Sequence, residues 1–156
     1  MQRESVLIVD DEEMVLTSLS TYLALESDYE VLTFGSPRQA LAHLEAVDVG
    51  IIISDFLMPE MDGISFLTRA RELRPDVPRV LLTGYADKEN AIKAINQVEL
   101  YQYVEKPWDN DDIRLIIRNG LEKKQLLSKL TQKVNQINQA YGELQSIQQE
   151  ILKALA

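Results

Sequence analysis

Five short runs of mainly apolar residues recur between residues 5 and 104, and longer segments with helical spacing of apolar positions separate them. The runs cover residues 5–9, 30–34, 50–54, 79–83 and 100–104. Their length and composition predict β-strands that alternate with α-helices. This alternation indicates right-handed crossovers between parallel strands, with helices on both faces of the sheet. We therefore expect an α/β fold with a doubly wound parallel sheet.

Polar residues mark the starts of several helices. Ser36 is a favoured helix cap, Pro37 suits the first helical position, and Gln39 completes a capping box. In the fourth expected helix, Ile92 and Ile95 lie three residues apart and therefore share a face. The other starts predicted in this way follow Asp62-Gly63, Asp87 and Asp109.

The last helical pattern does not stop where the sheet ends. Residues 111–156 contain no proline, and their only glycines are Gly120 and Gly142. From Leu127 onward, eight of nine heptad a and d positions are apolar, which predicts a coiled coil. We therefore expect a compact domain over residues 1–122 and a coiled-coil extension of the fifth helix over residues 123–156. The a and d series is Leu127, Leu130, Val134, Ile137, Tyr141, Leu144, Gln148, Ile151 and Leu155.

The extension is expected to pair two copies of the chain as a parallel homodimer, because parallel pairing would deliver both C-termini together to an output domain. Gln148, a polar residue at an a position, can fix the register of such a pair. Two alternatives stay open: the helix can pack back on its own domain, or several helices can assemble in antiparallel or four-helix form. Apolar residues at e and g positions keep the second alternative open, namely Leu126, Ala140, Ile147 and Leu152.

Composition and charge narrow the class of protein. Of the 156 residues, 46% are apolar, which is ordinary for a folded domain, and no apolar run approaches the ~20 residues of a membrane span. The absence of cysteine excludes disulfides and thiolate metal sites, and no signal peptide is recognisable, so we expect a cytoplasmic protein. Residues 1–60 hold 12 acidic and two basic side chains, which argues against direct binding of nucleic acid.

Polar side chains gather where the expected strands end. Asp10 and Asp11 follow the first strand, and Asp55 follows the third. Thr83 ends the fourth strand, and Lys106 lies just after the fifth. Ligand chemistry in a parallel α/β sheet gathers at the carboxyl ends of its strands. Three carboxylates are unfavourable together unless a cation neutralises them, and oxygen ligands without cysteine or clustered histidine favour Mg²⁺ over zinc.

Each of these residues also has an ordinary structural explanation, such as a helix cap for Asp10 or a turn for Asp55. Their coincidence at four strand ends favours a functional site. A carboxylate can attack phosphorus to form an acyl phosphate, and the reaction needs positive charge and hydrogen-bond donors near the phosphoryl oxygens. We therefore predict Asp55 as the nucleophile, with Lys106 and Thr83 beside the phosphoryl group.

Four motifs over about residues 4–122 together resemble the receiver domain of two-component response regulators. The resemblance implies a flavodoxin-like (βα)5 fold with strand order 2-1-3-4-5, and a phosphohistidine on a sensor histidine kinase or phosphotransfer protein as the phosphodonor. The motifs are Val9-Asp10-Asp11-Glu12, Ser54-Asp55 with Met58-Pro59-Glu60-Met61-Asp62-Gly63, Leu82-Thr83-Gly84, and Val104-Glu105-Lys106-Pro107-Trp108.

The resemblance also implies roles for individual residues. It makes Asp55 the phosphoacceptor and Asp11 a direct Mg²⁺ ligand, with Asp10 acting nearby through water. The main-chain carbonyl of Leu57 would complete the protein ligands. In this family the side chain of the residue two positions after the acceptor borders the path of the water that hydrolyses the acyl phosphate. The bulk of Leu57 at that position therefore predicts a long-lived phosphorylated form.

Further roles concern the two last strands. Thr83 and Tyr103 match the switch pair of the family, and Tyr85 would also border the path of the hydrolytic water. Lys106 matches the site lysine, and a cis peptide bond is expected between Lys106 and Pro107.

The motifs around Thr83 and Lys106 look like those of one subgroup of receivers, found ahead of HD-type cyclic-dinucleotide phosphohydrolases or hydrogenase-regulator-type activators. We predict a signalling switch that catalyses only its own phosphotransfer and dephosphorylation. Three alternatives are an aspartyl-phosphate-type phosphatase, a flavodoxin-like binder of small ligands, and a dimerisation module that is not phosphorylated. The first would need an Asp-x-Asp motif after the first strand, and the second a glycine-rich loop there.

Overall fold

The computed structural model describes residues 3–84 and 87–155, except for the side chains of residues 88 and 94–97. Tyr85 and the side chain of Ile95, which enter the predictions above, lie outside the described residues. The chain divides into two compact units, Met1–Lys124 and Gln125–Ala156. Among the described residues, no helix combines the length and the apolar character that crossing a membrane requires.

The first unit is built on a five-stranded sheet in which every pairing is parallel. The strand order is β2-β1-β3-β4-β5, which confirms the predicted order 2-1-3-4-5. Three strands have the predicted bounds, whereas the third reaches Asp55 and the fifth begins two residues late. The strands are β1 (Ser5–Val9), β2 (Glu30–Phe34), β3 (Ile51–Asp55), β4 (Arg79–Thr83) and β5 (Gln102–Glu105).

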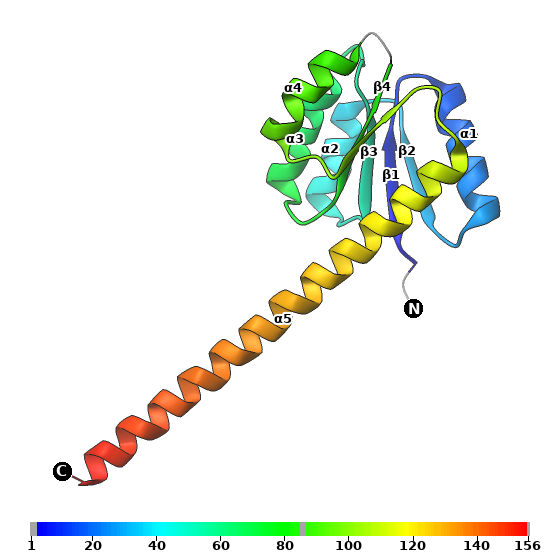
Figure 1. Ribbon diagram of the computed structural model, residues 1–156. Coiled ribbons are helices and arrows are strands. Elements are labelled where there is room, and N and C mark those ends of the chain that lie inside the picture. Colours follow the sequence, from blue (N-terminus) through cyan, green and yellow to red (C-terminus); the bar gives the residue numbers. More distant parts are fainter. Residues whose placement is uncertain (1–2, 85–86, 156) are drawn as a thin grey trace. The chain divides into compact units, whose positions relative to one another are not determined.

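Helices cover both faces of the sheet, as the strand and helix alternation predicts (Figure 1). On one face lie α2, α3 and α4, and on the other lie α1 and the first part of α5. The helices are α1 (Glu13–Glu26), α2 (Pro37–Ala46), α3 (Gly63–Leu73), α4 (Lys88–Val98) and α5 (Asn110–Leu155).

Alternate residues of the three central strands supply two hydrophobic cores. In β1, Leu7 and Val9 face α2 and α3, whereas Val6 and Ile8 face α1 and α5. All four side chains are fully buried. Burying one such side chain stabilises the fold by about 1.5–3 kcal/mol. These nearly continuous apolar strands are typical of a parallel sheet that is covered on both sides.

Side-chain caps form at three of the predicted helix starts. The Ser36 hydroxyl accepts a hydrogen bond from the Gln39 amide (3.4 Å), and Asp62 accepts one from the Ser65 amide (2.7 Å). Asp109 caps α5 by accepting from the Asp111 amide (2.9 Å). Each cap satisfies a main-chain donor that the first helical turn leaves without a partner.

The structure describes only some of the side chains of the fourth helix, so the shared face of its two isoleucines stays a prediction. Asp87 precedes α4 but makes no side-chain cap, and Ile92 is 45% exposed. Among the described side chains of α4, Ala91 and Val98 join the core.

One buried charged residue joins β4 to the segments around it. Arg79 is only 5% exposed, although its side chain is positively charged. Its guanidinium donates hydrogen bonds to the main-chain carbonyls of Val77 (3.0 Å), Pro75 (3.3 Å) and Glu99 (3.1 Å). Because Glu99 follows the last residue of α4 in a left-handed conformation (φ 50°), Arg79 fixes the C-terminal end of that helix.

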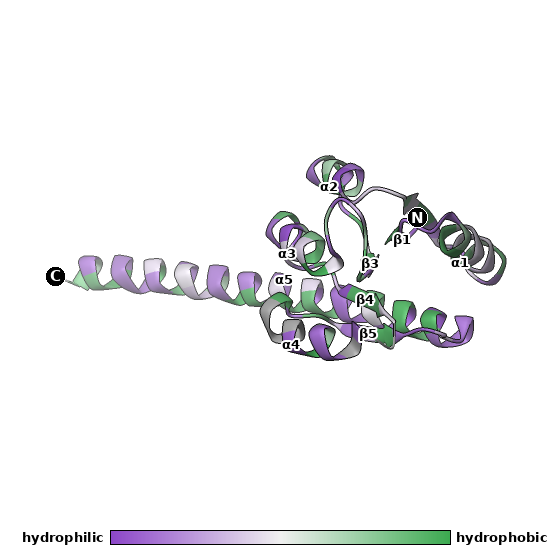
Figure 2. Cartoon of the chain, turned by 90° about the horizontal axis from the view of Figure 1, so that it is seen from above, coloured by the Kyte–Doolittle hydropathy of each residue, from purple (hydrophilic) through white to green (hydrophobic). Residues whose placement is uncertain are grey.

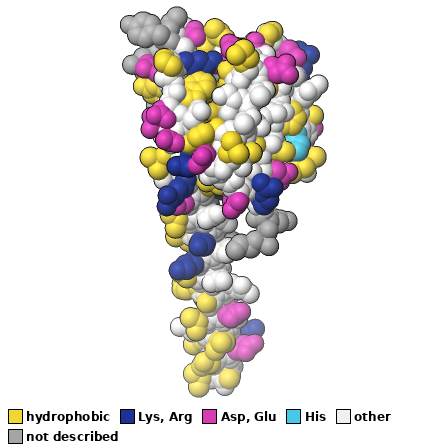
Figure 3. Space-filling view, turned by 90° about the vertical axis from the view of Figure 1, so that its right-hand side faces the viewer, with side chains coloured by type: hydrophobic (Ala, Val, Ile, Leu, Met, Phe, Trp, Pro, Cys, Tyr) yellow, Lys and Arg dark blue, Asp and Glu magenta, His cyan; other side chains and the backbone are white. Residues whose placement is uncertain are grey.

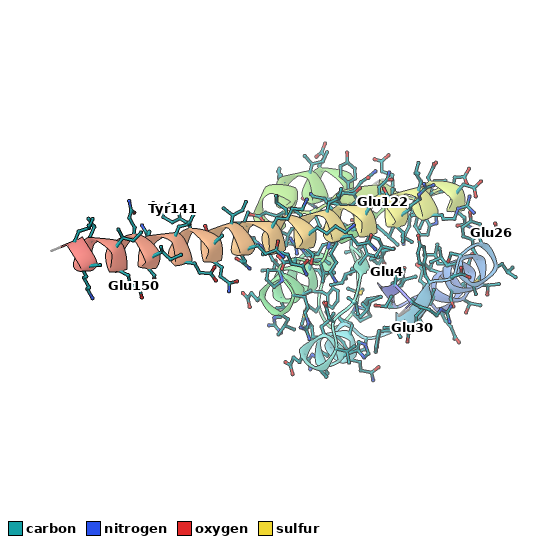
Figure 4. The ribbon with its side chains drawn as sticks, turned by 90° about the horizontal axis from the view of Figure 1, so that it is seen from below. Glu4, Glu26, Glu30, Glu122, Tyr141 and Glu150 are labelled. Carbon is teal, nitrogen blue, oxygen red and sulfur yellow. The ribbon has the colours of Figure 1, made fainter. Side chains whose placement is uncertain are left out.

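Polar contacts join α1 to α5 at the surface of the first unit. The Tyr22 hydroxyl donates to Asp111, and Arg114 pairs with Glu26 at 3.3 Å. Figure 4 labels Glu26 on α1. At the other end of this part of α5, Lys124 donates to the Val49 carbonyl at 2.7 Å. These contacts fix the α5 segment over residues 110–124 within the first unit.

In the second unit, every described residue of α5 is exposed. Hydrophobic and hydrophilic residues alternate along this segment (Figure 2), and hydrophobic side chains gather on it in the space-filling view (Figure 3). Tyr141 at an a position and Glu150 point to opposite sides of the helix (Figure 4). The other exposed large apolar residues of the segment are Leu126, Leu127, Leu130, Val134, Ile137, Leu144, Ile147, Ile151, Leu152 and Leu155.

Candidate functional site

The fold brings the predicted polar residues to the carboxyl edge of the sheet. Asp10 follows β1, Asp55 ends β3, and Thr83 ends β4. Lys106 directly follows β5. This edge is where parallel α/β proteins place their ligand chemistry.

Three carboxylates form the acidic part of this site. Asp10, Asp11 and Asp55 each offer an oxygen, and these oxygens lie within 4.8 Å of one another. Asp10 is fully buried and Asp55 is 6% exposed, whereas Asp11 faces solvent. The Glu12 amide donates to Asp10 Oδ1 at 2.9 Å, which positions that carboxylate. Asp10 Oδ2 is buried and, within the described part of the chain, receives no hydrogen bond.

Burial sets the acidity of the two inner carboxylates. It raises the pKa of Asp10 to about 6, and the nearby negative charge of Asp55 adds to the increase. Burial also raises the pKa of Asp55, although the hydrogen bond and the charge of Lys106 oppose that increase. The site therefore favours the arrival of positive charge.

Lys106 supplies one positive charge. Its Nζ lies 3.0 Å from Asp55 Oδ1, and its main-chain amide donates to the Thr83 carbonyl at 2.8 Å. Burial lowers the pKa of Lys106. The hydrogen bond to Asp55 and the nearby negative charges raise it by a larger amount, so the pKa lies above its ordinary value. The peptide bond between Lys106 and Pro107 is cis, as predicted. The Trp108 ring lies beside the ammonium, with 5.9 Å from Nζ to the ring centroid.

The two residues of the predicted switch pair lie on neighbouring strands. Thr83 is fully buried, and its hydroxyl donates to the Val104 carbonyl at 3.4 Å. Tyr103 on β5 is paired in register with Leu81 of β4 and packs partly buried against the core. The structure therefore places Thr83 at the edge of the site and Tyr103 two residues before the end of β5.

The loop between Asp55 and α3 borders the site and carries contacts that the motifs alone do not indicate. The Leu57 side chain is 57% exposed in this loop. The Phe56 amide donates to the Leu82 carbonyl (2.9 Å), and the Gly63 amide donates to the Phe56 carbonyl (2.7 Å). At the outer side, the Ser36 hydroxyl donates to Glu60 at 2.9 Å. In the sequence, Gly63 belongs to a predicted helix start and to a family motif, and neither indicates the hydrogen bond that its amide donates to Phe56.

The donor set fits a hard divalent cation. The acidic cluster offers only oxygen atoms, which Mg²⁺ prefers, and a charge of +2 would offset carboxylates that burial otherwise makes costly to ionise. Asp10 Oδ2, which receives no hydrogen bond from the described residues, is an acceptor that a cation or its bound water would satisfy. A zinc site would instead draw on cysteine or histidine, which the cluster lacks.

The sequence is similar to those of curated regulatory proteins. The chain is 36% identical over 118 residues to the hydrogenase transcriptional regulatory protein HoxA of Bradyrhizobium diazoefficiens, covering 76% of this chain and 24% of that protein. The chain spans about a quarter of the length of this protein and of two further curated relatives, HoxA of Cupriavidus necator and the regulatory protein AtoC of Escherichia coli.

Solved structures show the same fold. The signal receiver domain of an HD domain-containing protein from Pseudomonas fluorescens Pf-5 is 35% identical, with a TM-score of 0.74 over 80% of this chain and 98% of that one. A structure described as adenylate cyclase from Rhodopirellula baltica is 30% identical, with a TM-score of 0.79 over 86% of this chain and 98% of that one. Residues 6–118 match the response regulator receiver domain. The chain therefore belongs to the family of response regulator receiver domains.

Proposed function

We propose that this receiver is a phosphorylation-dependent signalling switch that accepts a phosphoryl group onto Asp55 from the phosphohistidine of a sensor histidine kinase or phosphotransfer protein. One observation carries the proposal: Asp55 Oδ1 lies 3.0 Å from Lys106 Nζ, and an Asp55 oxygen lies within 4.8 Å of oxygens of Asp10 and Asp11. A nucleophile, an ammonium and an acidic cation site therefore share the carboxyl edge of the sheet.

The proposed transfer uses these groups in a simple order. An Asp55 carboxylate oxygen forms a bond to phosphorus as the phosphorus–nitrogen bond of the donor breaks, and the imidazole nitrogen keeps the electron pair. Lys106 pairs with the charge that the phosphoryl group brings, and the Thr83 hydroxyl donates a hydrogen bond to another phosphoryl oxygen. No separate substrate is turned over, so the chain acts as a switch and not as an enzyme with an external product.

The carboxylates of Asp10, Asp11 and Asp55 would hold Mg²⁺, together with the main-chain carbonyl of Leu57. When bound, this cation supplies positive charge that lets the anionic carboxylate and the anionic phosphoryl group approach each other. Asp11 is the exposed member of the cluster and would ligate directly, whereas the buried Asp10 would act nearby through water.

Intact-mass measurement tests the acceptor. In Mg²⁺ and a small phosphodonor such as acetyl phosphate, the full chain should gain the mass of one phosphoryl group, and Asp55→Asn should gain none. Asp28→Asn, on the short segment before β2, is the matched acidic control and should be labelled like the wild type. Equal labelling of the Asp55 variant would remove Asp55 as the acceptor.

The proposed output path runs from Thr83 and Tyr103 to α5. In the proposed switch, Thr83 moves toward the phosphoryl group, Tyr103 turns into the space it leaves, and the face formed by β4, α4, β5 and α5 changes. Because α5 is one helix from Asn110 to Leu155, a change at that face can alter the packing of its extension. We propose a receiver over residues 1–122 and a coiled-coil transmission segment over 123–156.

The proposed partner of the extension is a second copy of the chain in parallel orientation. The exposed a and d side chains would be buried by such pairing. In a parallel, in-register pair, Gln148 faces Gln148 of the second copy, so the two amides can hydrogen-bond. In an antiparallel pair with a and d layers matched, Gln148 faces Leu130 or Ile137, and the amide loses its partner.

A further inference from the structure

The start of α3 touches the main chain of the proposed phosphoacceptor. A Cβ atom added to Gly63 would lie 2.1 Å from the Asp55 carbonyl oxygen and 3.0 Å from its carbonyl carbon. The same atom would also lie 3.0 Å from a methyl group of Leu81. Main-chain atoms cannot move aside as a flexible side chain can, so any residue other than glycine must displace Asp55 or α3.

Backbone conformation does not explain this glycine. None of the described glycines has a positive φ, so Gly63 is not needed for a left-handed turn. Glycine is also a poor helix former, and Gly63 is the first residue of α3. The requirement is therefore for space between the first turn of α3 and the end of β3.

The contacts around this position fix the peptide that leaves Asp55. The Ser54 hydroxyl donates to the Asp55 carbonyl at 3.0 Å. The Gly63 amide donates to the Phe56 carbonyl at 2.7 Å, and the Phe56 amide donates to Leu82 at 2.9 Å. Asp55 is thus held on its main-chain side by α3 and β4, while its carboxylate meets Lys106 on the other side.

We propose that Gly63 is a positioning residue for phosphoryl transfer, because its lack of a side chain lets α3 hold the Asp55 main chain where the carboxylate reaches both Lys106 and the cation site. The inference rests on the proposed function of Asp55. It assigns to Gly63 an effect on metal binding and on the transfer rate, beyond its contribution to stability.

A second glycine of the same strand region provides a matched control. Gly50 directly precedes β3, and its added Cβ would lie 2.8 Å from the Ser5 carbonyl oxygen and 2.5 Å from a methyl group of Leu121. Gly50→Ala therefore meets a main-chain oxygen as Gly63→Ala does, but at the amino end of the strand, away from Asp55. Both variants should unfold at lower urea concentration than the wild type.

The two variants should differ in Mg²⁺ affinity and in phosphorylation rate. Phosphorylation rate is measured by intact mass at saturating Mg²⁺ and acetyl phosphate, and Mg²⁺ affinity by Trp108 fluorescence, under conditions where circular dichroism shows a folded chain. Gly63→Ala should lower Mg²⁺ affinity by about tenfold or more and the transfer rate by a similar factor. Gly50→Ala should stay within about twofold of the wild type in both. Equal values for Gly63→Ala and the wild type would overturn the proposal.

Ser54→Ala decides the question if Gly63→Ala does not fold. This variant removes the hydroxyl that holds the same Asp55 carbonyl and adds no bulk. It should lower Mg²⁺ affinity and the transfer rate by more than the Gly50 control does, and an unchanged site in this variant would contradict the role given to the Asp55 main chain. If the wild type itself is not labelled at Asp55, the proposed function fails first; if it is labelled and the variants match it, only the positioning role fails.

Discussion

At the scale of single residues, the buried Asp10 carboxyl should make stability depend on pH. Its pKa is about 6 in the folded chain against an ordinary 3.8, so between these values the folded state holds more protons than the unfolded state. The free energy of unfolding contributed by this group therefore falls as pH rises from about 4 to about 6, and the whole loss, about 3 kcal/mol, is present at pH 7.

Asp10→Asn removes this loss because an amide does not ionise. In chelator, urea unfolding at pH 4 and pH 7 should show the variant gaining about 2.4 kcal/mol relative to the wild type over that interval. Saturating Mg²⁺ should reduce the gain, since the cation stabilises the ionised cluster in the wild type. A difference between the two proteins that does not vary with pH would contradict the assignment.

Mg²⁺ binding should respond differently to substitutions at Asp11 and Thr83, which both lie at the carboxyl edge of the sheet. Asp11→Ala should abolish Mg²⁺ binding because it removes a carboxylate ligand, whereas Thr83→Ala should leave it intact because the hydroxyl serves only the phosphoryl group. Fluorescence of Trp108, whose ring lies 5.9 Å from Lys106 Nζ, can report the titration. Equal affinity in the wild type and the Asp11 variant would show that another residue supplies the ligand.

The lifetime of the acyl phosphate should depend on Leu57. Its exposed side chain offers no group that orients the water needed for hydrolysis. Leu57→Asn or Leu57→Glu introduces such a group and should change the dephosphorylation rate, followed by intact mass after removal of the phosphodonor. Gln39→Ala, at an exposed position of α2, serves as the control, and rates indistinguishable from that control would count against this role.

At the scale of elements, the residues that local patterns describe were predicted well. The strand order, the caps at Ser36 and Asp109 and the bounds of β1, β2 and β4 are confirmed. The start of β5 was predicted two residues early, because an apolar run does not show where pairing begins. In the structure, the Tyr101 amide already bonds to the Arg79 carbonyl just before the strand starts.

Such patterns do not predict contacts between segments that lie far apart in the sequence. The two terminal nitrogens of the Arg79 guanidinium donate hydrogen bonds to carbonyls from two connections, one before β4 and one after α4, and no spacing in the sequence indicates that they converge. The candidate site shows the same difference between features that local patterns predict and features that depend on long-range contacts. Its carboxylates and lysine were predicted from strand ends, whereas the space required at Gly63 depends on how closely α3 approaches β3.

At the scale of the whole molecule, the decisive measurement is the oligomeric state. Light scattering at micromolar concentration should show a dimer for the full chain and a monomer for a version that ends at Lys123, because only the full chain carries the exposed a and d series. Monomers in both cases would contradict the coiled coil.

Orientation needs a separate test. A cysteine introduced as Leu155→Cys should form a disulfide-linked dimer under mild oxidation if the helices are parallel, since the two positions then face each other. Ser128→Cys, at a b position outside the a and d series, is the control and should crosslink poorly. Efficient crosslinking between a Leu130→Cys chain and a Leu155→Cys chain, or between a Leu127→Cys chain and an Ile151→Cys chain, with none between two Leu155→Cys chains, would show the antiparallel form.

Arg79 has a consequence for how motion is distributed along α4. The helix follows Thr83 in the chain, and two contacts hold its opposite end: Val98 packs into the core, and the buried guanidinium of Arg79 donates to the Glu99 carbonyl. Because this end is held by a hydrogen bond to Arg79 as well as by packing, amide exchange with deuterium should be slowest near Val98 and should quicken toward Lys88. Arg79→Met should flatten this gradient by loosening the held end. Arg79, the first residue of β4, would therefore make thermal motion in α4 greatest at the end of the helix that follows Thr83, the last residue of β4.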